Sequence, residues 1–242
     1  MTSLLVRGAC PHDCPDTCGV VTEVRDGRAV AFRGDPDHAV TRGWLCAKVR
    51  PYLDHVYHPG RVLYPMRRSG PKGSGQWQRV TWEEAIAEIA GRWRDIIAGS
   101  GAEAILPYSY SGTLGLVQNT VCAARLWNRL GASQLWRSIC GAAAERAVNA
   151  TLGRRWAPPY QDVIHSRLVI LWGHNPVSTA PHFMPFLRQA QRAGCQVVVI
   201  DPHRTKSAEG ADWHLAPIPG CDGYLALGIA HVLVAERLHD KP

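Results

Sequence analysis

Three cysteines stand within nine residues near the start of the chain, and a fourth follows at a distance. Cys10, Cys14 and Cys18 are separated by three residues each, and 27 residues lie between Cys18 and Cys46. Ligand sets made only of sulfur favour soft metal centres, namely zinc or an iron–sulfur cluster. The sequence therefore predicts that these four side chains wall one metal-binding pocket.

The cysteine spacing favours one kind of centre over the other. Structural zinc sites usually take cysteines in pairs two to four residues apart, with each pair on its own turn. Here three cysteines share one loop and one stands apart, which suits a cubane cluster with an iron at each corner. The eight cysteines would also permit four disulfides, but a chain of 242 residues can fold without them. We place an iron–sulfur cluster ahead of zinc, and zinc ahead of disulfides.

Charge and hydropathy argue against several classes of protein. The net charge is +7, yet the arginines are dispersed and no nucleic-acid-binding motif is present, so we expect an anionic cofactor rather than a nucleic acid. The longest apolar runs are too short to cross a bilayer. Met1 lies nine residues before Cys10, which leaves no room for a signal peptide. If Met1 is the true start, we expect a cytoplasmic protein.

Residues 1–60 read as a small, strand-rich cluster module. Two β-prone runs, 20–24 and 29–32, flank Asp26-Gly27, and Asp-Gly between such runs is a strong hairpin signal. The hairpin fills the gap before Cys46 and would return that cysteine to the other three.

Residues 61–137 are predicted to form an α/β layer. A linker rich in proline, glycine and basic residues, with a tight turn at 70–75, leads to Thr81. Thr81 and Glu84 have the spacing of a capping box at a helix start. The predicted elements are a helix over 82–98 with its apolar face in the core, a buried strand over 104–108 and a second helix ending near Leu130.

Residues 138–242 contain one βαβ unit of the Rossmann-like kind. The predicted elements are a buried parallel strand over 167–172, a helix over about 181–193, a strand over 195–201 and a final helix over 225–238. The unit lacks Gly-x-Gly-x-x-Gly, which argues against ordinary nicotinamide binding. A nucleotide site is still expected beyond the carboxyl ends of the strands, where Gly173, Asn175 and Asp201 stand. His231 is expected to be a core histidine.

Cys140 precedes a helix predicted to end near Leu152. A thiolate at a helix N-terminus is stabilised by free amides and by the helix dipole. The alternative for Cys140 is a small buried thiol, which is the interpretation we prefer for Cys122.

The cysteine spacing, together with Gly-Trp-Leu-Cys-Ala-Lys at 43–48, resembles the N-terminal signature of the molybdopterin oxidoreductases, the superfamily of dimethyl sulfoxide reductase and formate dehydrogenase. The resemblance implies a centre of molybdenum or tungsten with bis(molybdopterin guanine dinucleotide). It implies a [4Fe-4S] cluster on Cys10, Cys14, Cys18 and Cys46. It places Lys48 between cluster and pterin, and it makes Cys140 the best match for the protein ligand of the metal. Gly141 replaces the histidine of formate dehydrogenases, which leaves the substrate open.

Three later motifs extend the resemblance. Trp172-Gly173-x-Asn175-Pro resembles the loop that receives the pyrophosphate of one pterin dinucleotide. The run Asp201, Pro202, His203, Arg204, Thr205 resembles the segment that meets the guanosine, with His203 in place of an arginine. Asp222 matches an aspartate that reads the guanine edge, and a carboxylate can accept hydrogen bonds from guanine N1 and N2. Helix capping stays the alternative for Asp201 and Asp222.

Together these features imply an α/β fold with a small N-terminal β-rich iron–sulfur module and Rossmann-like βαβ layers, an incomplete version of domains 1–3 of the formate dehydrogenase and dimethyl sulfoxide reductase fold. The implied function is the N-terminal part of an oxidoreductase that passes electrons between a small-molecule substrate at the metal and the cluster, and onward to a partner protein or subunit. Family members are longer, so we expect a fragment whose isolated activity is in doubt. A non-catalytic iron–sulfur electron carrier and a zinc-stabilised binding module stay open as alternatives.

Overall fold

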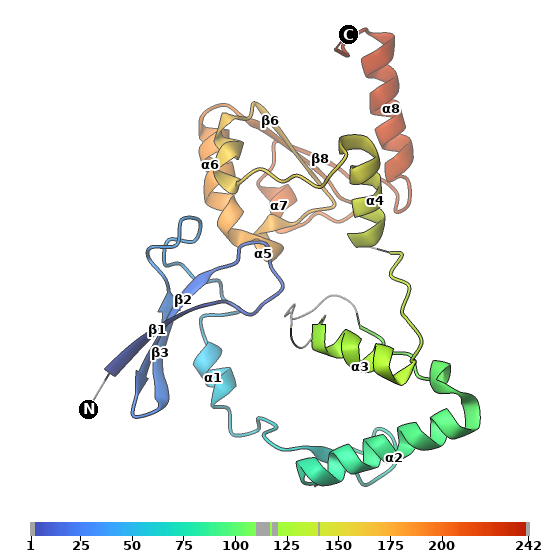
Figure 1. Cartoon of the computed structure of the whole chain (residues 1–242). Helices are drawn as coiled ribbons and strands as arrows, with labels where there is room; N and C mark the ends of the chain where they lie inside the picture. Colours follow the sequence, from blue (N-terminus) through green and yellow to red (C-terminus); the bar gives the residue numbers. More distant parts are fainter. Residues whose placement is uncertain (1–2, 110–116, 118–120, 140, 241–242) are drawn as a thin grey trace.

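In its described residues the chain forms three small sheets joined by helices and long connections (Figure 1). The computed structural model describes residues 3–109, 117, 121–139 and 141–240. The first sheet has the order β1-β2-β3, the second pairs β4 with β5, and the third has the order β6-β7-β8. The first two are antiparallel and the third is parallel. This arrangement confirms the α/β class with a β-rich N-terminal region.

The N-terminal sheet consists of β1 (Ser3–Ala9), β2 (Gly19–Arg25) and β3 (Arg28–Gly34). Asp26 and Gly27 form the turn between β2 and β3 with φ angles of 48° and 75°. Both angles lie in the left-handed region that aspartate tolerates and glycine favours, so the predicted hairpin is confirmed.

A small core beneath this sheet ties the cysteine loop to the segment that carries the fourth cysteine. Cys18, Val20, Leu45 and Val49 are buried together, and their partly buried neighbours include Cys10 and Cys46. The ring of Tyr52, at the start of α1 (Tyr52–Val56), stacks on Phe32 at a centroid distance of 5.7 Å. Burial of these apolar groups therefore holds the two cysteine-bearing segments against each other.

The connection after α1 contains a short hairpin, β4 (Met66–Arg68) and β5 (Trp77–Arg79), around the predicted tight turn. Helix α2 (Trp82–Ser100) follows, and Thr81 and Glu84 form the predicted capping box. The expectation that the apolar face of α2 lies in the core is wrong. Among the described residues no side chain of α2 is buried, and Trp82 is 64% exposed. Periodicity identified the apolar face but could not say what covers it.

The buried strand predicted over 104–108 is also wrong. Residues 102–104 form the short 3-10 helix η1 (Ala102–Ala104), and Tyr108 beyond it is 80% exposed without strand pairing. A strand needs a neighbouring strand for its backbone groups. In the described part of the chain, the amides of Ala104 and Ile105 instead bond locally to Gly101 O and Ala102 O, and Ile105 O accepts from Ser133 N at 2.9 Å. Helix α3 (Cys122–Leu130) ends at the predicted Leu130, but Cys122 is exposed rather than buried.

The C-terminal region is organised on the parallel sheet of β6 (Leu168–Trp172), β7 (Gln196–Ile200) and β8 (Trp213–Leu215). Its core contains Leu171, Val197 and Val199 from the strands, Leu187 from α6 and Ala208 from α7. On β6 the opposite face is open, because Leu168 and Ile170 are 53% and 49% exposed. The predicted βαβ unit is thus present, and the expectation that its first strand is fully buried is wrong.

Short helical elements surround the parallel sheet. In chain order they are α4 (Gly141–Leu152), η3 (Tyr160–His165), α5 (Pro176–Thr179), η4 (Pro181–Phe183), α6 (Met184–Arg192), α7 (Lys206–Glu209) and α8 (Asp222–Ala235). Helix α8 projects away from the sheet in Figure 1 and buries none of its described side chains. His231 on α8 is exposed, so the expectation of a core histidine is wrong.

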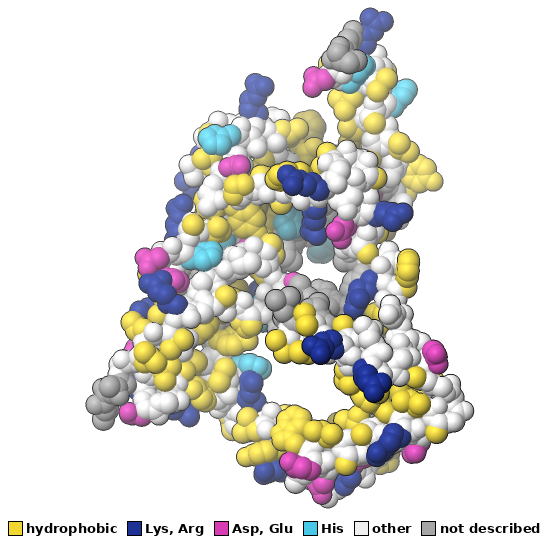
Figure 2. Space-filling model, viewed as in Figure 1, with side chains coloured by type: hydrophobic (Ala, Val, Ile, Leu, Met, Phe, Trp, Pro, Cys, Tyr) yellow, Lys and Arg dark blue, Asp and Glu magenta, His cyan; other side chains and the backbone are white. Residues whose placement is uncertain are grey.

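The chain exposes far more surface than its mass requires. Its accessible surface is 18110 Å² for 26.6 kDa, whereas a compact monomer of that mass exposes about 10,700 Å². Figure 2 shows hydrophobic side chains gathered along α2 in the lower part of the view. Among the described residues, no helix combines the length and the hydropathy needed to cross a membrane. The exposed apolar faces are therefore surfaces that further protein could cover.

The cap of α2 gives a first test. Thr81→Ala removes the acceptor for the Glu84 amide, which lies 3.1 Å from Thr81 Oγ1. We expect a loss of about 0.5–2 kcal/mol in the free energy of unfolding, measured by urea denaturation, and faster amide exchange in the first turn of α2. Thr81→Ser keeps the hydroxyl and should stay near wild type. Equal exchange in all three proteins would contradict the role of the cap.

The approach of two backbone segments in the cluster module gives a second test. A Cβ on Gly34 would collide with the Gly43 carbonyl, on the segment that leads to Cys46. Gly34→Ala should therefore cost about 1–3 kcal/mol in the free energy of unfolding. A Cβ on Gly91 in α2 would meet only open space, so Gly91→Ala is the control and should stabilise by about 0.5–1 kcal/mol. Equal effects of the two substitutions in urea denaturation would refute this assignment.

Candidate functional site

The four predicted cysteine ligands come from two segments of the N-terminal module. Cys10, Cys14 and Cys18 lie in the loop between β1 and β2, which Cys10 N closes by donating to Cys18 O at 2.8 Å. Cys46 begins a turn in which its carbonyl accepts from Val49 N and Arg50 N at 3.1 Å each. All four thiols are unpaired; Cys18 is buried and the other three are partly buried.

The thiols lie within electrostatic reach of one another. Burial raises the pKa of Cys18 to about 12, and the nearby Cys10, Asp16, Cys14 and Cys46 contribute to that rise. Burial also raises the pKa of Cys14, while the ammonium group of Lys48 acts against that rise. A raised pKa disfavours the thiolate, yet metal ligation requires the deprotonated form. The positive charge of a metal centre would stabilise these thiolates.

The donor set fits an iron–sulfur cluster. It consists of sulfur only, and the segment of Cys46 is packed against that of Cys18. Among the described residues, no three His, Cys, Asp or Glu side chains are arranged to hold one metal ion. A cubane cluster needs its ligands spread around several irons, and a sulfur-only set with three members in one loop and the fourth on a second segment suits that requirement.

The cysteine loop lies against the segment that follows β6. Cys14 Sγ donates to Thr179 O at 3.3 Å, and Lys48 Nζ donates to Ser178 O at 2.9 Å. Both acceptors belong to α5, which lies beside the loop in Figure 1. The structure thus brings Lys48 and the cysteines to the same segment that carries Asn175.

A buried polar group that sequence reasoning missed strengthens this contact. Asp16, inside the cysteine loop, is 1% exposed and faces His182 of η4, which is 4% exposed. Asp16 Oδ2 lies 2.6 Å from His182 Nδ1, and Asp16 Oδ1 accepts from the hydroxyl of Tyr160 at 2.9 Å. The spacing of His182 suggests no metal site, so it gave no reason to single this histidine out. The one signal in the sequence that could have indicated this contact was Asp16, a charged residue between the predicted ligands Cys14 and Cys18.

The predicted pyrophosphate loop and Asp222 come together beyond the end of β6. Trp172 Nε1 donates to Asp222 Oδ1 at 2.6 Å. Gly173 turns the chain with a φ of 60°, and its amide donates to Ile200 O at 2.8 Å. Asn175 Oδ1 accepts from the hydroxyl of Ser207 at 2.6 Å, which fixes the loop against α7.

The predicted residues after β7 have local hydrogen bonds. Asp201 Oδ1 accepts from His203 N at 2.8 Å. Thr205 caps α7 by accepting from Ala208 N at 3.3 Å, and Arg204 is exposed. Helix capping was the alternative role for the aspartates, and at α7 it is Thr205 that has this role. Arg204 keeps a free approach to solvent at this edge of the sheet.

Cys140, the predicted protein ligand of the metal, lies outside the described residues. The helix predicted to follow it is present as α4 and ends at Leu152. The role of Cys140 therefore stays a prediction.

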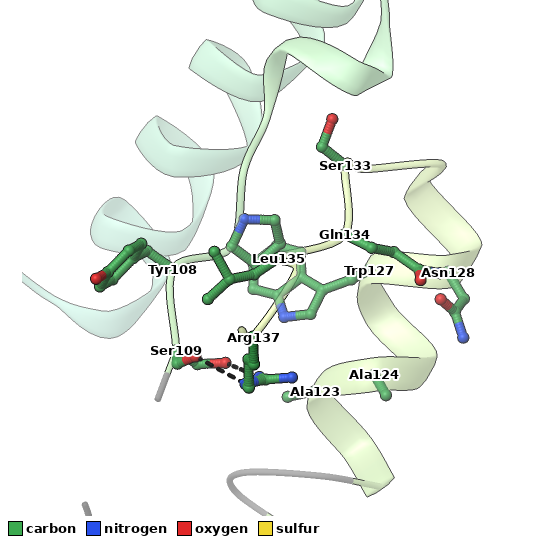
Figure 3. A pocket seen from close by; sticks show the side chains of 11 residues that line it. Tyr108, Ser109, Ala123, Ala124, Trp127, Asn128, Ser133, Gln134, Leu135 and Arg137 are labelled. Atoms are coloured by element: carbon green, nitrogen blue, oxygen red, sulfur yellow. Dashed lines mark hydrogen bonds between the residues drawn. The ribbon is translucent and has the colours of Figure 1, made fainter. Parts of the chain in front are cut away.

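A separate cavity of about 490 Å³ lies between the segment before residue 110 and α3 (Figure 3). Arg137 spans it by donating to Ser109 Oγ at 2.7 Å, and Trp127 and Leu135 line it. Among the described residues, none of the predicted site residues lines this cavity, so it is distinct from the cysteine loop and from the loop after β6.

Comparisons with known proteins identify the family of this chain. The family described as molybdopterin oxidoreductase matches residues 61–242, and the molybdopterin oxidoreductase Fe4S4 domain matches residues 5–58. The Fe4S4 match confirms the iron–sulfur prediction over the zinc alternative. The two matches together indicate a [4Fe-4S] cluster and a molybdopterin-bound molybdenum or tungsten.

Individual relatives are similar over nearly the whole of this chain. Probable oxidoreductase YoaE of Bacillus subtilis is 39% identical over 98% of this chain and 35% of its own length. The alpha subunit of perchlorate reductase of Dechloromonas aromatica is 32% identical over 96% of this chain and 25% of its own. Among solved structures, acetylene hydratase from Pelobacter acetylenicus matches with a TM-score of 0.66 and 27% identity, over 97% of this chain and 32% of that chain.

The chain thus spans about a third of the length of YoaE and of the acetylene hydratase. Family membership itself rests on the match over residues 61–242, which is more than half of the chain. With four free cysteines in the N-terminal module and the segment after β6 packed against it, this chain belongs to the molybdopterin oxidoreductase family and has its Fe4S4 domain at residues 5–58.

Proposed function

We propose that this chain is the part of a molybdenum or tungsten oxidoreductase that holds the [4Fe-4S] cluster and one pterin dinucleotide side by side. The observation that carries the proposal is the contact between the cysteine loop and α5, made by Cys14 with Thr179 and by Lys48 with Ser178. When bound, the metal–pterin centre supplies electron-pair exchange with a small-molecule substrate, and the cluster supplies one-electron transfer to a partner protein or subunit. The compartment we propose is the cytoplasm, where unpaired thiols persist.

Lys48 is the residue proposed to lie between the two cofactors. Its ammonium group is anchored to Ser178 O at 2.9 Å and acts on the thiol of Cys14. A fixed positive charge beside a ligand cysteine stabilises the anionic form of the site. Its position, between a cluster ligand and the segment that carries Asn175, supports the role that the family resemblance implies.

Trp172, Gly173, Asn175 and Asp222 are proposed to hold the dinucleotide, with Asp201, Arg204 and Thr205 at the neighbouring strand end. The Trp172 indole orients the Asp222 carboxylate through Oδ1. Within the described residues Oδ2 accepts no other hydrogen bond, so it is open to a guanine N–H. Arg204 supplies an exposed positive charge for phosphate. Cys140 is proposed as the protein ligand of the metal.

Iron binding tests the cluster ligands. The wild-type chain, reconstituted with iron and sulfide without oxygen, should carry about four irons per chain and absorb broadly near ~400 nm. Cys14→Ser should lose most of this absorption and fall well below four irons, because one corner of the cluster loses its thiolate. Cys122→Ser, at an exposed cysteine on α3, is the control and should behave as wild type. A colourless wild-type protein would overturn the assignment.

Nucleotide selectivity tests Asp222. Titration calorimetry should show that the wild-type protein prefers GDP to ADP, since only guanine offers two adjacent donors to a carboxylate. Asp222→Asn should weaken GDP binding by about 10- to 100-fold and leave ADP binding unchanged. Asp95→Asn, on the exposed face of α2, is the matched control. Equal affinity of the wild type for GDP and ADP would remove Asp222 from this role.

Hydration is a second candidate reaction class, because the chain is similar to acetylene hydratase. Hydration adds water without a net change in oxidation state, so it differs from the reaction of an oxidoreductase. The two classes separate in one assay on the loaded protein with reduced methyl viologen. An oxidoreductase should oxidise the dye when a reducible substrate such as an S-oxide, an N-oxide or nitrate is added. A hydratase should form product from an alkyne while the dye stays reduced.

A further inference from the structure

A buried polar cluster joins four parts of the chain directly beside a cluster ligand. Asp16 belongs to the cysteine loop, Tyr160 to η3 and His182 to η4, and the carbonyl of Trp44 belongs to the segment before Cys46. Asp16 and His182 are almost completely buried. Buried polar groups are costly unless they are paired, so their arrangement calls for an explanation.

The partners of the His182 ring indicate how its nitrogens are used. Nε2 lies 3.0 Å from the Trp44 carbonyl, which can only accept, so Nε2 carries a hydrogen. Nδ1 lies 2.6 Å from Asp16 Oδ2, which also accepts from the His182 amide at 3.2 Å. Asp16 Oδ1 accepts from the Tyr160 hydroxyl. The Asp16 carboxyl oxygens thus face the Tyr160 hydroxyl, the His182 amide and the His182 ring, and each ring nitrogen of His182 faces an oxygen atom.

The ring lies alongside the sulfur of Cys18. The Sγ atom is 3.8 Å from His182 Nδ1 and 4.0 Å from Nε2, so the sulfur faces the imidazole between its two nitrogens. The indole of Trp44 packs edge-on against the same ring at a centroid distance of 4.5 Å. Water is excluded here, because both Cys18 and His182 are buried, and charge acts strongly over such distances in a protein interior.

We propose that His182, oriented by Asp16 and the Trp44 carbonyl, is a positioning residue that raises the reduction potential of the [4Fe-4S] cluster through Cys18. This inference rests on the proposed function, because it requires the cluster on Cys18. Potentials of such clusters depend on net charge and on the groups around their sulfurs. The same residues tie the cysteine loop to the segment that begins at the nucleotide loop, since His182 lies seven residues after Asn175.

The two members of the pair have opposite effects on the potential. His182→Gln removes the ring that faces Cys18 Sγ and takes from the Asp16 carboxyl group its nearest partner, so it should lower the midpoint potential of the cluster. Asp16→Asn removes negative charge with little change of volume, so the potential should not fall. Both variants should release iron to a chelator more readily, with an apparent affinity about 10- to 100-fold lower, because each loosens the contact between loop and η4.

Anaerobic dye-mediated redox titration of the loaded protein with dithionite, followed by electron paramagnetic resonance, measures these potentials. His231→Gln, at an exposed histidine on α8, is the matched control and should leave the potential unchanged. Tyr160→Phe removes only one donor to Asp16, which leaves more of its negative charge unbalanced. It should lower the potential less than His182→Gln does, and it gives a second measurement if that variant fails to fold.

The outcomes separate this inference from the proposed function. A wild-type protein that takes up no iron overturns the proposed function, and with it the cluster. A wild type that carries the cluster, with an unchanged potential in His182→Gln, overturns only the role of His182. A fall of the potential in both His182→Gln and Asp16→Asn also overturns it, because loosening of the loop alone would act alike in the two variants.

Discussion

The contact between the cysteine loop and residues 176–182 is the interaction on which the site depends. It joins segments at least 130 residues apart in the chain, through Cys14 and Thr179, Lys48 and Ser178, and Asp16 and His182. Two of these contacts use backbone carbonyls of α5, and the third is a buried carboxyl–imidazole pair at 2.6 Å. Buried pairs of this kind contribute modestly to net stability but are costly to break, so the contact fixes position more than it adds free energy.

Local sequence signals predicted the elements that local physics determines. Asp26-Gly27 can adopt left-handed angles, so the hairpin was readable from two residues. Thr81 and Glu84 satisfy each other and the first amides of α2, so its start was readable from their spacing. The cysteine spacing likewise predicted the cluster loop, because ligand chemistry restricts which residues can serve. Each of these signals acts within a few residues of chain.

The predictions that were wrong concern what covers an apolar face. The periodicity of α2 and the apolar run of β6 correctly marked faces that favour burial, yet Trp82 and Leu168 are more than half exposed. Burial depends on a neighbouring element, and the sequence of one helix contains no information about its neighbour. The pairing of Asp16 with His182 was missed for a related reason, since no spacing rule links residues 166 positions apart.

Residues 173–182 connect the proposed dinucleotide site to the proposed cluster site. The segment begins at Gly173, whose amide is held by Ile200 O at the end of the parallel sheet, and continues through Asn175, fixed by Ser207. It ends at His182 against the cysteine loop. Ten residues thus run from one proposed cofactor site to the other, with hydrogen bonds at both ends and in the middle. A displacement of the nucleotide loop would therefore be transmitted to Cys18 through a short, well-anchored path, without a change in the cluster ligands themselves.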